Sequence, residues 1–144
     1  MFVTTEDLYP IYQQYPVVCT DTRQITPGCL FFALKGDQFD GNQYAQEALS
    51  KGAAFAVIDD ESMAAGPSFL LVENVLESLQ DLARHHRKTF TFPVIALTGS
   101  NGKTTTKELI HAVLSSTYKT YTTEGNLNNH IGIPLTILKI KADA

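Results

Sequence analysis

The chain has 144 residues, of which 44% are hydrophobic, so it can bury a core, while no apolar run approaches the ~20 residues that a membrane span requires. Its amino-terminus has neither the basic start nor the apolar centre of a signal peptide, which predicts a cytoplasmic protein whose Cys19 and Cys29 are reduced. The net charge is −4, with six Lys/Arg and twelve Asp/Glu in residues 1–92 and five Lys/Arg and three Asp/Glu in residues 93–144. An acidic chain without a basic cluster is a poor candidate for binding nucleic acid.

The first part of the chain predicts helices and strands in an α/β order. The expected elements are a helix over 4–15, a strand over 29–34, a helix over 44–51, strands over 54–58 and 68–72, and a helix over 75–88. Thr4 and Asn74 are the expected N-caps, the latter in a capping box. We therefore place a first domain at residues 1–88. His85 and His86, at its end, are expected to interact with the helix C-terminus rather than to bind a metal.

Residues 94–106, with the sequence VIALTGSNGKTTT, predict a buried strand, a phosphate-cradling loop and the start of a helix. Backbone N–H groups at a helix start attract a polyphosphate, Lys103 adds a full positive charge, and the Thr104 hydroxyl suits Mg²⁺. Leu97 stands at the first glycine of the strict P-loop pattern, so the loop is a shorter variant. The alternative is a Gly-Asn turn with an incidental lysine. The residues assigned to ATP binding are Gly99, Ser100, Asn101, Gly102, Lys103, Thr104 and Thr105, with Lys103 catalytic and Thr104 the metal ligand.

A second candidate site combines Asp21-Thr22-Arg23 with residues 27–42, a strand that ends in a polar loop bounded by glycines. In α/β sheets, ligands bind at such strand ends. The segment offers donors and acceptors for a uracil edge, and Arg and Lys for a diphosphate. The alternative is that Asp21 and Arg23 form a surface ion pair, while Gly36 and Gly41 only turn the chain.

A third candidate segment, residues 123–136, holds three asparagines within four residues. It follows a predicted strand over 119–122 and leads into an apolar, helical run. Side-chain amides between glycines suit the binding of a ligand. An ordinary asparagine-rich helix cap is the alternative, and His130 is expected to form part of the loop wall.

These three segments together resemble the ATP-dependent Mur ligases of peptidoglycan synthesis over essentially the whole chain. Residues 98–105 look like the phosphate loop that these ligases share with folylpolyglutamate synthetase. Residues 21–41 resemble the UDP-binding domain of the MurE and MurF types, and residues 125–136 are similar to the MurF type. Thr22 stands where many relatives have Ser, and Asn42 where many have His.

The resemblance implies a UDP-binding α/β domain over residues 1–88 and, over residues 89–144, the beginning of a Rossmann-like P-loop ATPase domain. Family members have three domains, so we expect an amino-terminal fragment that is inactive alone and monomeric. The implied reaction adds D-alanyl-D-alanine to UDP-N-acetylmuramoyl-tripeptide through an acyl phosphate, with ATP and Mg²⁺. A MurE-type ligase and a non-catalytic nucleotide-binding or UDP-sugar-binding module are the alternatives. The implied substrate residues are Asp21, Thr22, Arg23, Lys35, Gly36, Asp40, Gly41, Asn126, Asn128 and Asn129.

Overall fold

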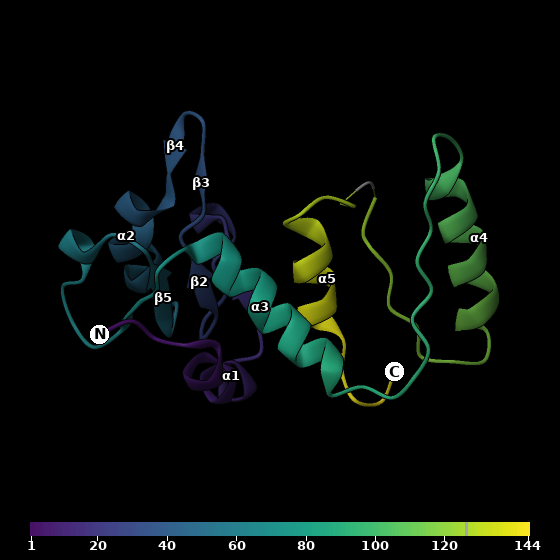
Figure 1. Cartoon of the computed structure of the whole chain (residues 1–144), viewed down its shortest axis with the longest axis horizontal. Coiled ribbons are helices and arrows are strands. Elements are labelled where there is room, and N and C mark those ends of the chain that lie inside the picture. The colour runs from purple at the N-terminus through teal and green to yellow at the C-terminus, as the bar shows by residue number, and fades with distance from the viewer. Residues whose placement is uncertain (126) are drawn as a thin grey trace.

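The computed structural model describes residues 1–125 and 127–144, and its first part is a parallel β-sheet with helices on both faces (Figure 1). The sheet has the order β1-β2-β5-β6, with β1 Val18–Cys19, β2 Leu30–Phe32, β5 Phe55–Ile58 and β6 Phe69–Leu71. A separate antiparallel hairpin consists of β3 Lys35–Gly36 and β4 Phe39–Asp40. The helices are α1 Thr5–Gln14, α2 Ala45–Ser50, α3 Val75–Lys88, α4 Lys103–Ser115 and α5 Gly132–Lys139, with short 3₁₀ turns η1 Thr22–Gln24, η2 Gly41–Tyr44 and η3 Glu61–Met63. This architecture confirms the predicted α/β class.

The central strand β2 is buried because strands flank both of its edges and helices cover both of its faces. Leu30 and Phe32 belong to the cluster that includes Leu79 of α3, whereas Phe31 belongs to the cluster on the opposite face, with Ala48 of α2. Strands of parallel sheets that are covered on both faces read as unbroken apolar runs. This explains why the sequence of this segment does not alternate.

Both predicted N-caps are present. The Thr4 hydroxyl accepts from the Asp7 N–H, and the Asp7 carboxylate accepts from the Thr4 N–H, so α1 begins with a full capping box. The Asn74 side chain accepts from the Glu77 N–H at 2.9 Å, which is one of the two bonds of the box predicted for α3. These local bonds fix where the two helices begin.

The second part of the chain forms its predicted helices but not its predicted strands. Residues 94–97 and 119–122 both lie in the part of the chain that the structure describes, and neither is a strand. A strand requires a neighbour that satisfies its backbone groups, and no ladder of the described residues reaches either segment. Ile95 accordingly leaves 60% of its surface exposed. The two strand predictions are wrong for this structure.

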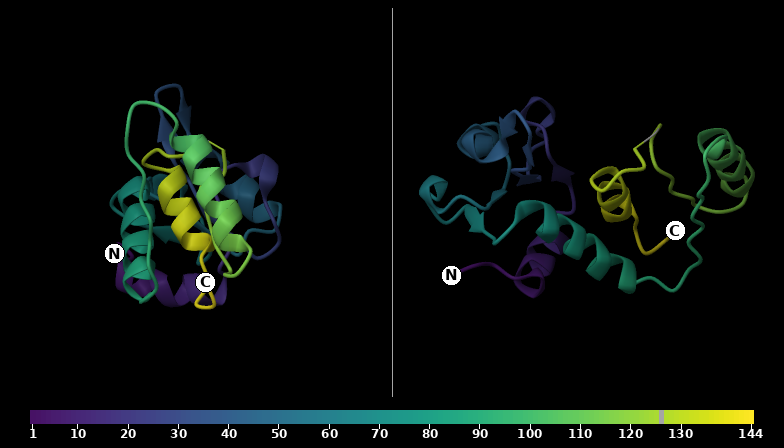
Figure 2. Two further views of the ribbon diagram at one scale, coloured as in Figure 1. Left: turned by 90° about the vertical axis from the view of Figure 1, so that its right-hand side faces the viewer. Right: turned by 45° about the horizontal axis from the view of Figure 1, so that its top comes forward.

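Helix α5 packs against α3 of the first part, although residues 89–131 separate them in the chain (Figure 2). Leu138 is 3% exposed and joins the same apolar cluster as Leu79. Helix α4 stands apart from this body in Figure 1 and in the right-hand view of Figure 2, and it is reached through an extended segment after α3. The two predicted domains therefore share one packed helix pair.

The end of α3 holds the end of α5 through His86. Its Nε2 lies 2.9 Å from the Ile140 carbonyl and 3.2 Å from the Tyr12 hydroxyl, while its Nδ1 lies 3.2 Å from the Tyr9 hydroxyl. Burial, with a smaller contribution from Tyr9, raises the pKa of Tyr12 to about 12, so this hydroxyl keeps its proton and donates to the Leu138 carbonyl at 2.6 Å. His86 was expected to interact with the C-terminus of its own helix, α3. Its ring bonds to Tyr9 and Tyr12 of α1 and to the Ile140 carbonyl at the end of α5.

No helix of residues 1–125 or 127–144 has both the length and the apolar character needed to cross a membrane.

Candidate functional site

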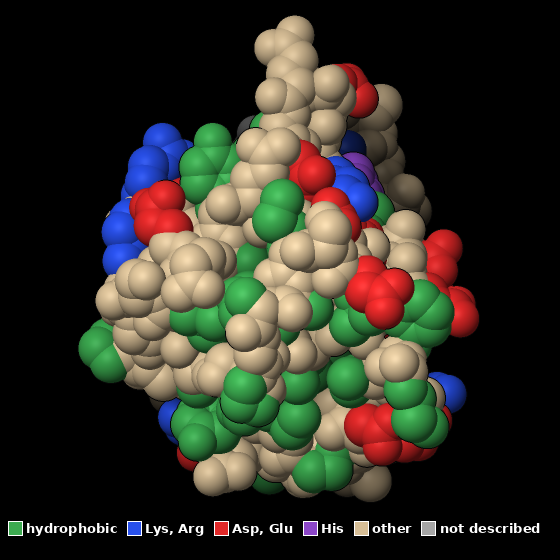
Figure 3. Space-filling view, turned by 90° about the vertical axis from the view of Figure 1, so that its left-hand side faces the viewer, with side chains coloured by type: hydrophobic (Ala, Val, Ile, Leu, Met, Phe, Trp, Pro, Cys, Tyr) green, Lys and Arg blue, Asp and Glu red, His purple; other side chains and the backbone are tan. Residues whose placement is uncertain are grey.

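The parallel sheet brings several polar segments to one edge. The segments with Asp21, Lys35 and Asp59 follow the carboxyl ends of β1, β2 and β5 respectively. Because the strands are parallel and adjacent, all three segments leave the sheet on the same side. The hairpin β3-β4 rises from this edge and projects beyond the body of the molecule (Figures 1 and 3).

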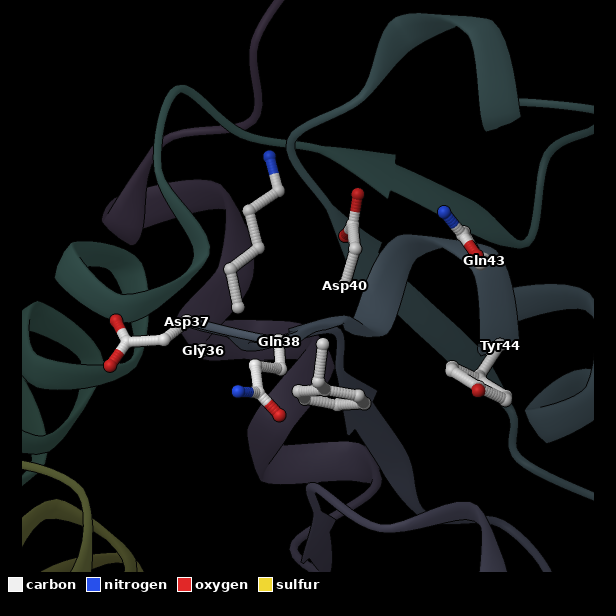
Figure 4. A pocket seen from close by; sticks show the side chains of 8 residues that line it. Gly36, Asp37, Gln38, Asp40, Gln43 and Tyr44 are labelled. Carbon is white, nitrogen blue, oxygen red and sulfur yellow. The ribbon is translucent and has the colours of Figure 1, made fainter.

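The hairpin forms one wall of a cavity of about 420 Å³. Its lining residues are Lys35, Gly36, Asp37, Gln38, Phe39, Asp40, Gln43 and Tyr44 (Figure 4). Three of the predicted substrate residues, Lys35, Gly36 and Asp40, are among them. Gly41 lies at the base instead, where a Cβ would stand 2.5 Å from the Leu34 carbonyl oxygen, so this close approach requires glycine.

Two aromatic residues of this cavity were not predicted. The rings of Phe39 and Tyr44 stack with centroids 5.9 Å apart and remain 47% and 42% exposed. Exposed aromatic faces beside polar side chains suit a planar ligand. The sequence signal that could have found them is an aromatic residue inside the glycine-bounded polar loop.

A buried polar cluster under the hairpin was also missed. The Asp59 carboxylate lies 2.7 Å from Lys35 Nζ, and it accepts from the Asn42 amide at 2.9 Å and from the Val75 N–H at 3.2 Å. Burial raises the pKa of Asp59, but these three donors more than offset it, and the net pKa lies below its ordinary value. The same contact with Asp59 raises the pKa of Lys35. The sequence showed Asp59 only as part of an acidic loop.

The Asp21-Thr22-Arg23 cluster adopts the arrangement of the alternative interpretation. Asp21 caps η1 and forms a bidentate ion pair with Arg23, whose hydrogen bond lowers the pKa of Asp21 to about 2. The Thr22 carbonyl accepts from Lys51 Nζ at 3.0 Å. None of the three residues lines the hairpin cavity. Arg23 leaves 85% of its side chain exposed and keeps solvent-facing N–H groups.

The phosphate loop ends in a helix start that no side chain caps. Gly102 is the N-cap of α4 in the left-handed conformation, with φ of 76°, and the first turn contains no acidic residue. A Cβ built at Gly99 or Gly102 would meet nothing within 4 Å, so the space beside both glycines is open. Lys103 Nζ donates to the Gly99 carbonyl across this loop. Exposed N–H groups together with an ammonium group are an arrangement at which proteins often bind anions.

The other predicted loop residues surround this turn. Ser100 and Asn101 are exposed in the loop, and Thr104 and Thr105 are exposed in the first turn of α4. Among the residues that the structure describes, no three His, Cys, Asp or Glu side chains gather into a metal site. The assignment of Thr104 as a metal ligand stays a prediction.

The asparagine-rich segment bonds to the start of α5, whose N-cap residue is Ile131. Asn129 Oδ1 accepts from the N–H groups of Gly132 at 2.7 Å and Ile131 at 3.2 Å, which is the helix-cap interpretation. Asn128 is exposed, and Asn126 lies outside the described residues. Sequence reasoning missed Lys107 of α4, which donates to the carbonyls of Thr123 and Gly125 at 2.6 and 2.8 Å and so holds this segment beside the phosphate-loop helix.

Three predicted segments lie on one side of the molecule. The β3-β4 hairpin, the loop before α4 and the segment before α5 are all at the top in Figure 1, and they remain there in both views of Figure 2. A ligand that extends from the hairpin to the phosphate loop would pass the segment that precedes α5.

Comparison with known families matches two consecutive regions of this chain. Residues 14–87 match the model of the Mur ligase family, catalytic domain, and residues 97–144 match the Mur ligase middle domain. The chain is 46% identical over 134 residues to the UDP-N-acetylmuramoyl-tripeptide–D-alanyl-D-alanine ligase of Bacillus subtilis, and 43% identical over 123 residues to that of Escherichia coli. These alignments cover 90% and 85% of this chain but 29% and 27% of the relatives, so it spans less than a third of their length.

Solved structures give the same result. A MurF ligase from Thermotoga maritima in complex with ADP aligns with a TM-score of 0.76 at 34% identity, over 85% of this chain and 28% of that protein. MurF from Acinetobacter baumannii aligns with a TM-score of 0.82 at 31% identity, over 97% of this chain and 33% of that protein.

Proposed function

The chain belongs to the Mur ligase family, and we propose that it carries the UDP-binding and phosphate-binding parts of a UDP-N-acetylmuramoyl-tripeptide:D-alanyl-D-alanine ligase. The observation that carries this proposal is the placement of the hairpin cavity and the uncapped phosphate loop on one side of the molecule. The similarity to ligases of this name in Bacillus subtilis and Escherichia coli supports the choice of substrates.

The hairpin cavity is the proposed site of the UDP group. Phe39 and Tyr44 present a plane against which a base can stack. Gln43 and the carboxylate of Asp40 supply a donor and acceptors for a uracil edge. Lys35 is the cation of the lining, and Arg23, at the same sheet edge, offers a second one for a diphosphate.

The start of α4 is the proposed ATP site. The open turn between Gly99 and Gly102 admits a polyphosphate, and Lys103 can leave its contact with the Gly99 carbonyl for a phosphate oxygen. A hydroxyl ligand at Thr104 fits Mg²⁺, which binds through one or two protein oxygens together with phosphates and water. When bound, this ion would supply positive charge that offsets the repulsion between the anionic reactants.

The proposed reaction has two steps. A carboxylate oxygen of the tripeptide attacks the γ-phosphorus, the bond to ADP breaks, and an acyl phosphate forms. The amine of D-alanyl-D-alanine then attacks the carbonyl carbon, inorganic phosphate leaves, and the nitrogen loses a proton. Lys103 and the N–H groups of α4 offset the repulsion between the anionic reactants. The hairpin holds the remote UDP group and thereby orients the reacting end.

A hybrid ligase tests this proposal, in which residues 1–144 replace the matching part of the Bacillus subtilis relative. We expect phosphate release with D-alanyl-D-alanine and UDP-linked tripeptide, and none with a diamino acid and UDP-linked dipeptide. The reverse preference would assign the chain to the MurE type. The chain alone should bind UDP without turnover, and a hybrid that folds, binds UDP and ATP, and turns over neither substrate pair would favour a non-catalytic binding module.

A further inference from the structure

Asn42 is the one polar residue among the buried residues of the described chain, with 1% of its surface exposed. Its Nδ2 donates to Asp40 Oδ1 at 2.8 Å and to Asp59 Oδ1 at 2.9 Å. Its Oδ1 accepts from the N–H of Asp59 at 3.0 Å and from that of Asp60 at 3.3 Å. Both ends of this amide are therefore satisfied, and they join the end of the hairpin to the end of β5.

Asp59 extends this connection to two other elements. Its carboxylate pairs with Lys35 of β3, and it accepts from the Val75 N–H at the start of α3. Only 10% of its side chain is exposed, whereas 49% of the Lys35 side chain is exposed. A mostly buried carboxylate thus fixes the direction of a cation that lines the hairpin cavity.

The hairpin requires such anchoring. β3 and β4 contribute only two residues each, and an isolated two-stranded hairpin is at best marginally stable in water. The exposed Phe39 and the residues of the turn add little buried surface. Its shape therefore depends on what holds its base, which is the close contact of Gly41 and the bonds of Asn42 and Asp59.

We propose that Asn42 and Asp59 are positioning residues for the UDP group: they lock the hairpin to the sheet edge and aim Lys35 at the bound diphosphate. This inference rests on the proposed function of the hairpin cavity. Neither residue lines the cavity, so both act through Lys35 and Asp40 rather than by touching the ligand.

UDP binding to the chain, measured by calorimetry, tests this proposal. Asp59→Asn keeps the shape of the side chain but points an N–H₂ group at donors and removes the charge that faces Lys35. We expect it to raise the Kd for UDP at least about tenfold, the scale of a hydrogen bond to a charged group. Asp60→Asn is the matched control, because the Asp60 side chain bonds to Ser62 and the substitution leaves its backbone N–H to Asn42 in place, and its Kd should stay within about twofold of the parent.

A double-mutant cycle separates positioning from a general loss of stability. Lys35→Ala should weaken UDP binding, and adding Asp59→Asn to it should cause clearly less than the product of the two single effects, because Asp59 acts through Lys35. Asn42→Ala should weaken binding as well, and circular dichroism identifies any variant that fails to fold. Asp59→Asn retains the side-chain volume and keeps the test decisive if Asn42→Ala unfolds.

The outcomes distinguish the inference from the proposed function. A folded parent chain that binds no UDP would overturn both. A parent that binds UDP, together with an Asp59→Asn variant that binds it equally well, would overturn the positioning role alone. Independent, multiplicative effects of Lys35→Ala and Asp59→Asn would also overturn it.

Discussion

Residues 1–88 and residues 89–144 carry equally clear sequence patterns, but only the first of these regions forms a sheet. Both regions form their predicted helices. A helix satisfies its backbone groups within one segment, whereas a strand requires a second segment beside it. The difference shows that an apolar, β-prone run predicts a strand only when the chain also supplies its neighbours.

β2 and residues 94–97 make this contrast concrete. Both are short apolar runs that follow a proline-containing turn. Leu30 lies between Val18 of β1 and Phe55 of β5 and is fully buried, but Ile95 has no such partners among the described residues and is mostly exposed. Burial and pairing, and not the propensity of the residues, separate the two.

The largest expected difference between the regions concerns the removal of one leucine side chain from a helix. Leu79→Ala in α3 removes a fully buried side chain and should lower the free energy of unfolding by about 4 kcal/mol. Leu109→Ala in α4 alters a residue that is 64% exposed and should change it by less than about 0.5 kcal/mol. Denaturant unfolding measures both, and equal losses would show that α4 packs as tightly as α3.

A second expectation is that the less packed region carries the chemistry. Lys103→Ala in the hybrid ligase should lower the rate of phosphate release at least about 100-fold, near 3 kcal/mol of transition-state stabilisation, since one cation leaves the phosphate site. Lys119→Ala is the matched control, because its half-exposed ammonium pairs with Asp143, away from the phosphate loop in the sequence. Near-normal turnover by Lys103→Ala would remove this residue from the proposed site.

The third prediction concerns residues 94–97 in a protein that offers strands with which they can pair. In the hybrid ligase, the amides of residues 94–97 should exchange with solvent at least about 100-fold more slowly than in the chain alone, equivalent to about 2.7 kcal/mol of local stability. Hydrogen exchange followed by mass spectrometry measures this, with the amides of β2 as the reference. Equally fast exchange in both proteins would mean that this run is not a strand even when partners are available.

A smaller effect should follow when the link between the regions is weakened. Tyr12→Phe removes the bond from the Tyr12 hydroxyl to the Leu138 carbonyl and should cost about 1 kcal/mol in the free energy of unfolding. Tyr44→Phe, which alters an exposed ring of η2, should have no measurable effect on stability. Equal stabilities of Tyr12→Phe and the parent would indicate that α5 is held by its apolar contacts alone.

The smallest predicted effect depends on pH. Because the pKa of Asp59 is lower in the folded chain, its charge stabilises the fold above the ordinary carboxyl pKa of about 4, and this contribution is lost as the pH falls through the folded value. Lys35 is half exposed, so the difference in unfolding free energy between the parent and Asp59→Asn should stay below about 1 kcal/mol. This difference in unfolding free energy should become smaller from pH 7 to pH 3. A difference that stays constant would contradict a lowered pKa of Asp59 in the folded chain.

Local patterns predicted what local physics determines. Thr4 and Asn74 were identified as caps because capping bonds span only three residues. β2, β5, β6 and the helix after the phosphate loop followed from apolar periodicity and glycine placement, whereas the two-residue strands β1, β3 and β4 were not predicted. Lys103 and Gly102 were assigned to one loop because the motif is continuous in sequence.

Contacts between distant segments were beyond this reasoning. Asn42 meets Asp59 across 17 positions, and His86 meets Ile140 across 54. Neither contact has a periodic signature, because a single polar residue against a single partner leaves no repeat in the sequence. The pairing of Asp21 with Arg23 was visible as an alternative, but sequence spacing alone does not distinguish an ion pair from a binding cluster.

The packing of α5 against α3 has a consequence for what happens if the chain is cut. Helix α5 has eight residues, and the chain from α3 through α4 links it covalently to α3, the helix against which it packs. Such a tether raises the effective concentration of a weak partner to the millimolar range. A nick in the exposed run of residues 93–101 would turn the same contact into an association between two fragments. After such a cleavage, the share of the fragment with α4 and α5 that stays bound to the sheet would fall as the protein is diluted.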